Sequence, residues 1–186
     1  MMAYAVVDFT ASRLMLVAGG IAACACLLGI FTPLHARSGS APQSCSQDAE
    51  ERDNLQIVRS AFARWGAGGN VFDGLLAENV VWTIHGSGSV AGTYKGLRDF
   101  TERAAQPLVR RLSTPLVPTV HFMVSDRDRV IVRFGGAATT TSGKPYRNEF
   151  LWIFRMDGGR VVEAEAFLDL AAYQRVIDSN EPHARM

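Results

Sequence analysis

Residues 149–169, EFLWIFRMDGGRVVEAEAFLD, decide the fold of this chain. They predict two apolar strands joined by a turn at 157–159, and they end in Asp169, an acidic residue that opens a helix. The first strand alternates aromatic with aliphatic side chains, which indicates that both of its faces are buried: Phe150, Leu151, Trp152, Ile153 and Phe154. We expect this hairpin to close a curved sheet whose inner face can hold a small molecule.

Compact turn sequences separate a series of predicted strands in the second half of the chain, at 116–124, 130–139, 146–156 and 160–167. The first half predicts a long helix from Asp48 to the glycine-rich stretch at 66–69, a short helical piece at 72–76, a strand at 79–85, and a helix at 97–112 kinked at Pro107. Helices followed by consecutive hairpins indicate an α+β domain, with the helices packed on one face of a bent antiparallel sheet.

The first 47 residues differ in composition from the rest of the chain. Arg13 is followed by an apolar run at 14–34 and then by a stretch rich in Ser, Gly and Pro. This pattern predicts an export segment with a linker at 1–47, a folded domain at 48–178 and a C-terminal tail at 179–186. We therefore expect a domain that is exported to the periplasm or secreted, or anchored to the membrane by this segment.

Three alternatives are compatible with the export segment. Small residues around positions 34–41 would suit cleavage before Arg37 or Pro42. The apolar run is close to the roughly 20 residues that cross a bilayer, so the segment could instead be retained as an anchor. Lipidation at Cys24 is the third alternative, because residues 21–24 resemble a bacterial lipobox, although the apolar residues 27–31 do not suit a flexible tether.

Charge and cysteine content argue against several function classes. The formal net charge is +1 and no run of like charges occurs, so we expect no nucleic-acid surface. Cys24, Cys26 and Cys45 all precede residue 48, which leaves the predicted domain without a disulfide, a cysteine nucleophile or a cysteine-based zinc site. The glycines at 86–88 do not fit a phosphate-binding loop. We expect neither a metal nor a cofactor.

Four motifs in chain order resemble the SnoaL-like branch of the nuclear transport factor 2 superfamily: VVWTIHG at 80–86, AGTYKG at 91–96, DGGRVVE at 157–163 and FLD at 167–169. The resemblance covers about residues 54–177. It implies a cone-shaped α+β barrel with a deep pocket between helices and sheet, often assembled as a homodimer through the outer sheet face. The family includes polyketide cyclases, ketosteroid isomerases, limonene-epoxide hydrolases and many pockets with no known ligand.

The catalytic residues of those enzymes are mostly missing. Ketosteroid isomerases carry a proton-shuttling carboxylate near the end of the first strand, where this chain has Ile84 beside His85. Residues 147–149 resemble the Arg-x-Asp of limonene-epoxide hydrolases with Glu149 replacing Asp, but Ala166 stands in the place of their second Asp. One carboxylate cannot readily act as both acid and base, so that mechanism does not carry over.

Polyketide cyclases of this family use a carboxylate and a histidine, and His85 could form such a pair with Glu149, Glu165 or Asp169. We take His85 and Glu149 as the first candidates for the acid/base pair. His85 ends the first predicted strand before a glycine-rich loop, and histidine titrates near neutral pH. The alternative is a surface histidine that is hydrogen-bonded to that loop. Asp169 is a weaker candidate, because it also suits the N-cap of the last helix.

Other ionisable side chains are expected outside the pocket. Glu163 and Glu165 should share the strand face of Phe167, away from Ala164 and Ala166, so at least one of them should be solvated. His121 is expected to be a packed or edge histidine, on the strand face opposite Val120 and Phe122.

Large aromatic side chains occur where helix and strand faces should converge. We assign these, with one amide, to the pocket wall: Trp65, Trp82, Tyr94, Asn148, Phe150 and Trp152. The same aromatic side chains would also suit a packed barrel core. Asn148 could orient a carbonyl or hydroxyl of a ligand, or bond to a neighbouring strand. Such a pocket would suit a flat apolar ligand, for example a terpenoid, sterol or polyketide.

Two functions follow from these observations. The sequence favours an exported SnoaL-like pocket protein that binds a small apolar molecule, because no set of family catalytic residues is complete. The alternative is a cofactor-independent isomerase, cyclase or hydrolase that uses His85 and Glu149 for proton transfer. The alternative predicts that His85 and a carboxylate share a cavity and titrate abnormally, whereas a binding protein needs neither.

Overall fold

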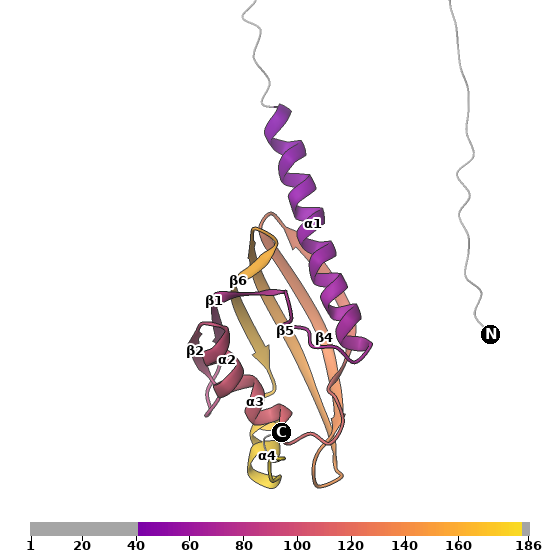
Figure 1. Cartoon of the computed structure of the whole chain (residues 1–186), viewed down its shortest axis with the longest axis vertical. Coiled ribbons are helices and arrows are strands. Elements are labelled where there is room, and N and C mark those ends of the chain that lie inside the picture. Colours follow the sequence, from indigo (N-terminus) through magenta and orange to yellow (C-terminus); the bar gives the residue numbers. More distant parts are fainter. Residues whose placement is uncertain (1–40, 184–186) are drawn as a thin grey trace, which may run out of the picture. The chain divides into compact units, whose positions relative to one another are not determined.

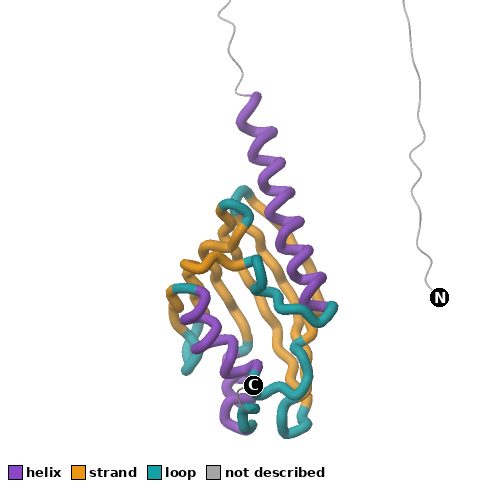
Figure 2. The backbone as a smooth tube through the Cα atoms, viewed as in Figure 1, coloured by secondary structure: helices purple, strands orange, loops and turns teal. Residues whose placement is uncertain are grey.

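A computed structural model describes residues 41–183 of the chain (Figures 1 and 2). Most of the predicted export segment, including the apolar run, Cys24 and the cleavage position before Arg37, lies outside the described residues. Among residues 41–183, no helix is both long and apolar enough to cross a bilayer.

The first helix, α1, spans Ala41–Gly66 and lies against two strands, β3 (Val117–Asp126) and β4 (Arg129–Thr139) (Figure 1). It begins seven residues before the predicted start at Asp48, within the predicted linker, because Pro42 is compatible with the first turn of a helix. Its buried positions, Val58, Ala61 and Phe62, recur at helical spacing. The helix ends as predicted at the glycine-rich stretch, where Gly68 adopts a positive φ of 96°.

Six strands form one curved, open sheet in the order β2-β1-β6-β5-β4-β3. Their bounds are β1 Leu76–Ile84, β2 Gly92–Lys95, β3 Val117–Asp126, β4 Arg129–Thr139, β5 Pro145–Asp157 and β6 Arg160–Leu168. The hairpins predicted between β3 and β6 are confirmed. The antiparallel prediction is wrong for one pairing, since β1 runs parallel to β6. Local turn signals report only strands that are adjacent in sequence, and these two are not.

The helical segment between β2 and β3 contains a change of helix type. It consists of α2 Leu97–Phe100, the π-helical turn η1 Thr101–Ala105 and α3 Gln106–Val109. Pro107 has no N–H to continue the α-helical pattern, and just before it the Gln106 N–H donates to Thr101 O, one residue further back than in an α-helix. The sequence predicts a kink at Pro107; the structure has a change of helix type at 101–105, just before this proline. The short helix predicted at 72–76 is a turn, and β1 begins at Leu76.

The inner face of the sheet carries the core. On β5, Phe150, Trp152 and Phe154 are buried, whereas Leu151 and Ile153 are only partly buried. The prediction that both faces of this strand are buried is therefore wrong, because its outer face is shared with charged side chains such as Arg155. On β6, the expected separation of Glu163 and Glu165 from the buried Ala164 and Ala166 is confirmed.

The last helix, α4 Leu170–Ser179, begins where the sequence predicts. Asp169 is its N-cap, and one carboxylate oxygen accepts a hydrogen bond of 2.9 Å from the Ala172 N–H. After the helix, Arg110 donates to His183 O and Arg111 donates to Asn180 O. The described part of the C-terminal tail is therefore bonded to the segment that follows α3.

Replacing Asp169 by Ala should lower the free energy of unfolding by about 1 kcal/mol, because the first turn of α4 loses the acceptor for an N–H group. Urea denaturation followed by circular dichroism measures this difference. Asp169→Asn keeps a capping oxygen and should stay close to the wild type. Equal stability of the Ala and Asn variants would contradict a capping role.

Candidate functional site

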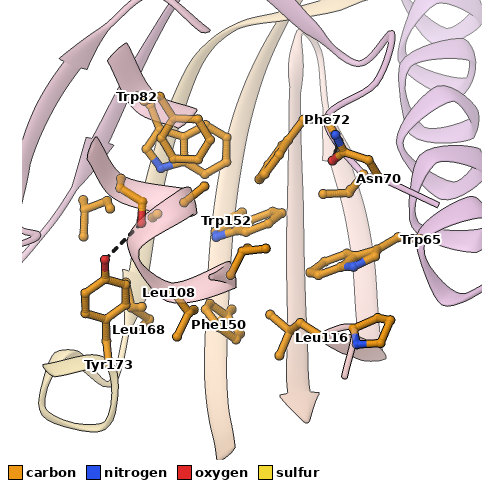
Figure 3. A pocket seen from close by; sticks show the side chains of 18 of the residues that line it. Trp65, Asn70, Phe72, Trp82, Leu108, Leu116, Phe150, Trp152, Leu168 and Tyr173 are labelled. Atoms are coloured by element: carbon orange, nitrogen blue, oxygen red, sulfur yellow. Dashed lines mark hydrogen bonds between the residues drawn. The ribbon is translucent and has the colours of Figure 1, made fainter. Parts of the chain in front are cut away.

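A cavity of about 270 Å³ lies between the inner face of the sheet and the helical segments (Figure 3). Its walls come from the end of α1, the loop at 69–72, β1, the helical segment 100–109, the loop at 115–116, β5, β6 and α4. Gly69, Asn70, Val109 and Pro115 are exposed lining residues, so the opening lies between the loop after α1 and the loop after α3.

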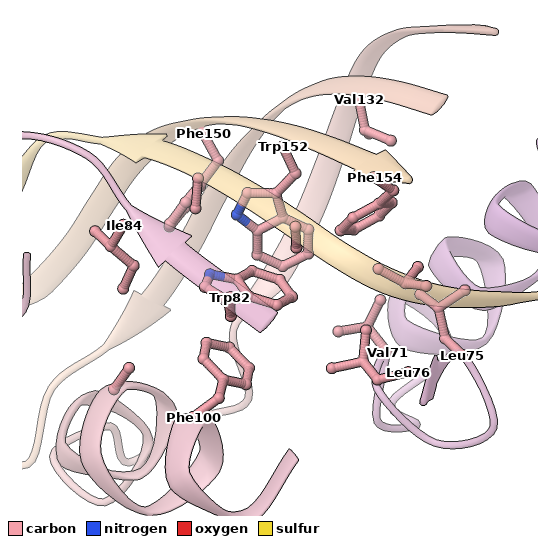
Figure 4. Packing of buried hydrophobic residues seen from close by; sticks show 14 of the residues in the cluster. Val71, Leu75, Leu76, Trp82, Ile84, Phe100, Val132, Phe150, Trp152 and Phe154 are labelled. Carbon is pink, nitrogen blue, oxygen red and sulfur yellow. The ribbon is translucent and has the colours of Figure 1, made fainter. Parts of the chain in front are cut away.

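Several aromatic side chains line this cavity, and three of them, Trp82, Phe100 and Trp152, pack together in the buried core (Figure 4). Trp65 and Trp152 are parallel, with ring centroids 6.0 Å apart, and Trp82 stacks on Phe100 at 4.1 Å. Trp82 also meets Trp152 edge to face at 5.2 Å. Four of the side chains that the sequence assigns to the pocket, Trp65, Trp82, Phe150 and Trp152, lie in its wall.

Tyr94 and Asn148, which the sequence also assigns to the wall, are not among the lining residues. The Tyr94 hydroxyl donates to Val90 O at 2.7 Å. Asn148 is only 5% exposed, and its amide donates to the Tyr146 hydroxyl and to Asp169 O. Its oxygen accepts from the Asp169 N–H at 2.9 Å. Asn148 therefore joins β5 to the start of α4, which leaves its amide already engaged.

Burial around that amide also affects Tyr146. The loss of solvent raises the pKa of the Tyr146 hydroxyl to about 12, although the hydrogen bond from Asn148 acts in the opposite direction. Tyr146 is therefore neutral at physiological pH and acts as a hydrogen-bonding group within this network.

His85 lies on the outer face of the sheet. Its Nε2 is 2.9 Å from Glu165 Oε2, and its ring stacks on Phe167 with a centroid distance of 4.5 Å. Glu165 and Phe167 alternate along β6 with Ala166, which lines the cavity. The partners of His85 are therefore on the opposite side of the sheet from the cavity.

Glu149 also points away from the cavity, because it alternates along β5 with the buried Asn148 and Phe150. Arg133 donates a hydrogen bond to its carboxylate, and His121 Nε2 lies 3.3 Å from the same oxygen. The hydrogen bond from Arg133, with a smaller contribution from His121, holds the pKa of the Glu149 carboxyl below its usual range.

The structure does not bring His85 and Glu149 together, and of the carboxylates considered as partners of His85 only Glu165 lies beside it, on the outer face. His85 pairs with Glu165, Glu149 pairs with Arg133 and His121, and Asp169 caps α4. The physical reason is strand alternation, which places His85 and Glu149 on the outer face in two separate charge pairs. Sequence reasoning missed the roles of Arg133 and His121. Only the strand register, in which Gly135 is opposite Glu149, makes Arg133 a diagonal neighbour of Glu149.

The cavity lining contains no Asp, Glu, His, Lys or Arg side chain. The Tyr173 hydroxyl donates to Ala104 O at 3.0 Å, and the Asn70 amide donates to Asp73 at 2.7 Å. Nor do the described residues contain a group of three or more His, Cys, Asp or Glu side chains that could hold a metal ion. The cavity can therefore offer shape, aromatic surface and a few N–H or O–H groups.

One fully buried polar atom of the lining has no hydrogen-bond partner. The indole Nε1 of Trp82 is buried and makes no hydrogen bond. The same is true of Asn54 Nδ2, which lies outside the lining. A buried donor without a partner costs about 1–3 kcal/mol, since the bond to water that it loses on folding is not replaced. Nothing within the described residues relieves this cost at Trp82.

The structure predicts how Glu149 titrates. Its carboxyl should remain ionised to a lower pH than an ordinary glutamate, because the charged form is hydrogen-bonded by Arg133. Arg133→Met should move the pKa of Glu149 upwards, towards the ordinary value. Carboxyl carbon chemical shifts followed by NMR during an acid titration measure this pKa.

Arg155→Met is the matched control, because Arg155 pairs with Glu163 on the same face. This substitution should leave the pKa of Glu149 unchanged. An ordinary pKa for Glu149 in the wild type would contradict the pairing with Arg133.

Comparisons with known proteins support the fold. Bal32a, from a soil-derived mobile gene cassette, is 22% identical with a TM-score of 0.56, over 68% of this chain and 98% of that chain. TerC, co-crystallised with polyporic acid, is 20% identical with a TM-score of 0.55, over 68% and 99%. An LEH-like epoxide hydrolase from M. tuberculosis is 14% identical with a TM-score of 0.52, over 70% and 93%. No curated protein matches the chain in sequence.

These structural similarities are all below 25% identity and establish a shared fold. They do not transfer the activity of any of these relatives to this chain. The sequence adds a family match, because residues 58–164, more than half of the chain, match the SnoaL-like domain. The curved open sheet with helices on its inner face, and the cavity between them, agree with that match. The chain belongs to the SnoaL-like family.

Proposed function

We propose that this SnoaL-like protein binds one small, neutral, apolar molecule in the cavity under its helices. The observation that carries the proposal is the lining itself, which combines aromatic and aliphatic walls with no ionisable acid or base other than the hydrogen-bonded Tyr173. Small-molecule sites are mostly apolar concavities with few polar groups, and about 270 Å³ lies just below their usual range of roughly 300–1,000 Å³. The ligand is therefore small.

Flat molecules suit these walls better than bulky aliphatic ones. Trp65, Trp152 and Phe150 present rings within one wall of the cavity, and Trp82 presents another ring from β1 (Figure 3). Aromatic faces and edges pack well against other planar groups. A planar terpenoid, polyketide or similar apolar metabolite fits this description.

The alternative, an acid/base enzyme that uses His85 and Glu149, receives no support from the geometry. A general acid or base must come within hydrogen-bond reach of the proton that it moves. His85 and Glu149 bond to partners on the outer face, and Asp169 caps a helix. The family and the fold include cyclases, isomerases and epoxide hydrolases, but their activities depend on site residues that this cavity does not present.

Filling the cavity should abolish binding of a neutral apolar probe. Ala105 lines the cavity from η1 and is partly exposed, so Ala105→Phe places a ring in the empty volume with little disturbance of the core. We expect the affinity for N-phenyl-1-naphthylamine, measured by its fluorescence increase, to fall at least about tenfold, because the added ring occupies the space of the probe.

Ala137→Phe is the matched control, because Ala137 is exposed on β4 and does not line the cavity. This variant should bind the probe as the wild type does. If Ala105→Phe binds the probe with unchanged affinity, the probe uses another surface and the proposal fails.

We also propose that the protein forms a homodimer through the outer face of the sheet. Large exposed apolar side chains support this, because Val81, Phe122, Val124 and Phe167 lie on that face among the charged pairs. Phe122 and Val124 lie on the edge strand β3, whereas Val81 and Phe167 lie on β1 and β6, and large apolar side chains exposed on one sheet face can form an interface. The resemblance to the superfamily supports the same assembly.

Export by the N-terminal segment is a further part of the proposal. The apolar run at 14–34 supports it, and the three alternatives of cleavage, retention as an anchor and lipidation at Cys24 give chains of different mass. Cleavage before Arg37 would leave α1 intact, whereas cleavage before Pro42 would remove its first residue.

Native mass spectrometry of protein purified from its own host tests both proposals together. We expect a dimer. Its chains should lack the N-terminal segment if that segment is cleaved, or keep it and be recovered from the membrane fraction if it is an anchor. Phe122→Asp should shift the dimer to monomer, because it buries a charge in an apolar contact, while Val109→Asp, outside that face, should not. A wild-type monomer at micromolar concentration contradicts the dimer. A full-length chain in the soluble cytosolic fraction contradicts export.

A further inference from the structure

The indole N–H of Trp82 is the one buried lining atom of the described cavity that lacks a hydrogen-bond partner. Less than 1 Å² of the nitrogen is accessible, and the whole side chain is 1% exposed. Buried donors in folded proteins are almost always paired, so an unpaired one calls for an explanation. Among the described residues, only Asn54 shares this property, and it does not line the cavity.

The Trp82 ring is held in place by its neighbours. It stacks on Phe100 with an interplanar angle of 15°, and it meets Trp152 and Phe72 edge to face at 86°. Rotation to reach a protein acceptor would break these contacts. In the close-up views the nitrogens of Trp82 and Trp152 point to the same side, towards the space between the sheet and the helical segment (Figures 3 and 4).

Two other polar side chains of the lining, Tyr173 and Asn70, already have hydrogen-bond partners within the protein. The Tyr173 hydroxyl donates to Ala104 O, and Asn70 bonds to Asp73 and to the backbone N–H of Phe72. The lining has no cation to balance an anionic ligand and no anion to balance a cationic one. What the cavity leaves unsatisfied at this point is a donor, which calls for a neutral acceptor.

We propose that the Trp82 indole N–H is the polar recognition point of the cavity, and that the ligand is a flat, neutral molecule with a carbonyl or ether oxygen at its inner end. This inference rests on the proposed binding function and specifies its ligand class. Because water-sized access to the nitrogen is closed in the free protein, binding includes a small shift of the lining side chains that admits the oxygen.

Two probes of matched shape test the inference: 2-acetylnaphthalene, which carries a ketone oxygen, and 2-ethylnaphthalene, which does not. Equilibrium dialysis gives the dissociation constant of each probe for the wild type and for Trp82→Phe. The variant keeps an aromatic ring but removes the N–H. We expect the preference for the ketone over the hydrocarbon to fall about tenfold in Trp82→Phe, the size of one net hydrogen bond, with hydrocarbon affinity changed less than about threefold.

Trp65→Phe is the matched control, because Trp65 also lines the cavity and its ring is only partly buried. It should change the affinities for both probes by the same factor. A second measurement uses the wild type alone, so that it does not depend on the folding of a variant. The indole ¹H–¹⁵N resonance of Trp82 should move downfield when the ketone binds and should not when the hydrocarbon binds.

The outcomes separate the two proposals. An equal loss of both probes in Trp82→Phe, or an indole resonance that responds alike to both, overturns the recognition role of Trp82 and leaves the binding function standing. Failure of the wild type to bind either probe overturns the binding function, and the inference with it.

Discussion

The two-residue alternation of side chains along β5 and β6 is the constraint on which the rest of the structure depends. It turns Phe150, Trp152 and Ala166 towards the helices, and it turns Glu149 and Glu165 towards the opposite face. A shift of one residue would exchange these two sets and place carboxylates inside the domain. Apolar interior and charged exterior are therefore consequences of one register, and so is the absence of acid/base side chains from the cavity lining.

The aromatic cluster built on that register explains why an open volume persists beside a well-packed core. Trp152 packs against rings from α1, β1, β4 and β5, which include Phe62, Trp82, Phe134 and Phe154. These rigid planar groups cannot collapse into every space between them. On the far side, the hydrogen bond from Tyr173 to Ala104 O ties α4 to the π-turn and fixes the helical wall. The cavity is therefore bounded by elements that are each fixed by contacts outside it.

Sequence reasoning succeeded where the signals were local. The hairpins between β3 and β6 and the cap at Asp169 each depend on a few adjacent residues, and the structure has both. The parallel pairing of β1 with β6 depends on contacts between distant segments, and no local pattern reports it. The same limit applies to the start of α1, because the composition of residues 41–47 is that of a linker although they are helical.

The site shows the same division. The alternation of side chains along β5 was enough to place Phe150 and Trp152 in the cavity wall. It also suggested Asn148, but the amide of Asn148 is hydrogen-bonded to Asp169 O and to the Tyr146 hydroxyl. Parity failed on β3, where a bulge at His121 separates Val120, opposite Phe134 on the inner face, from Phe122, opposite Arg133 on the outer face. A bulge is set by the pairing of two strands, so a single strand sequence does not reveal it.

If the proposed binding holds, a cavity of this kind selects its ligand mainly by what it excludes. Any charged or strongly polar group that enters must leave water without finding a partner, and that cost rejects it more strongly than aromatic contacts attract an apolar group. At one point the entry of a polar atom is favourable instead of costly. A ligand oxygen placed at the Trp82 N–H gives this unpaired donor a hydrogen bond and so removes the free-energy cost that it bears in the free protein. Selectivity would then come from one atom and an otherwise unreactive wall, which needs neither the histidine nor the carboxylates on the outer face.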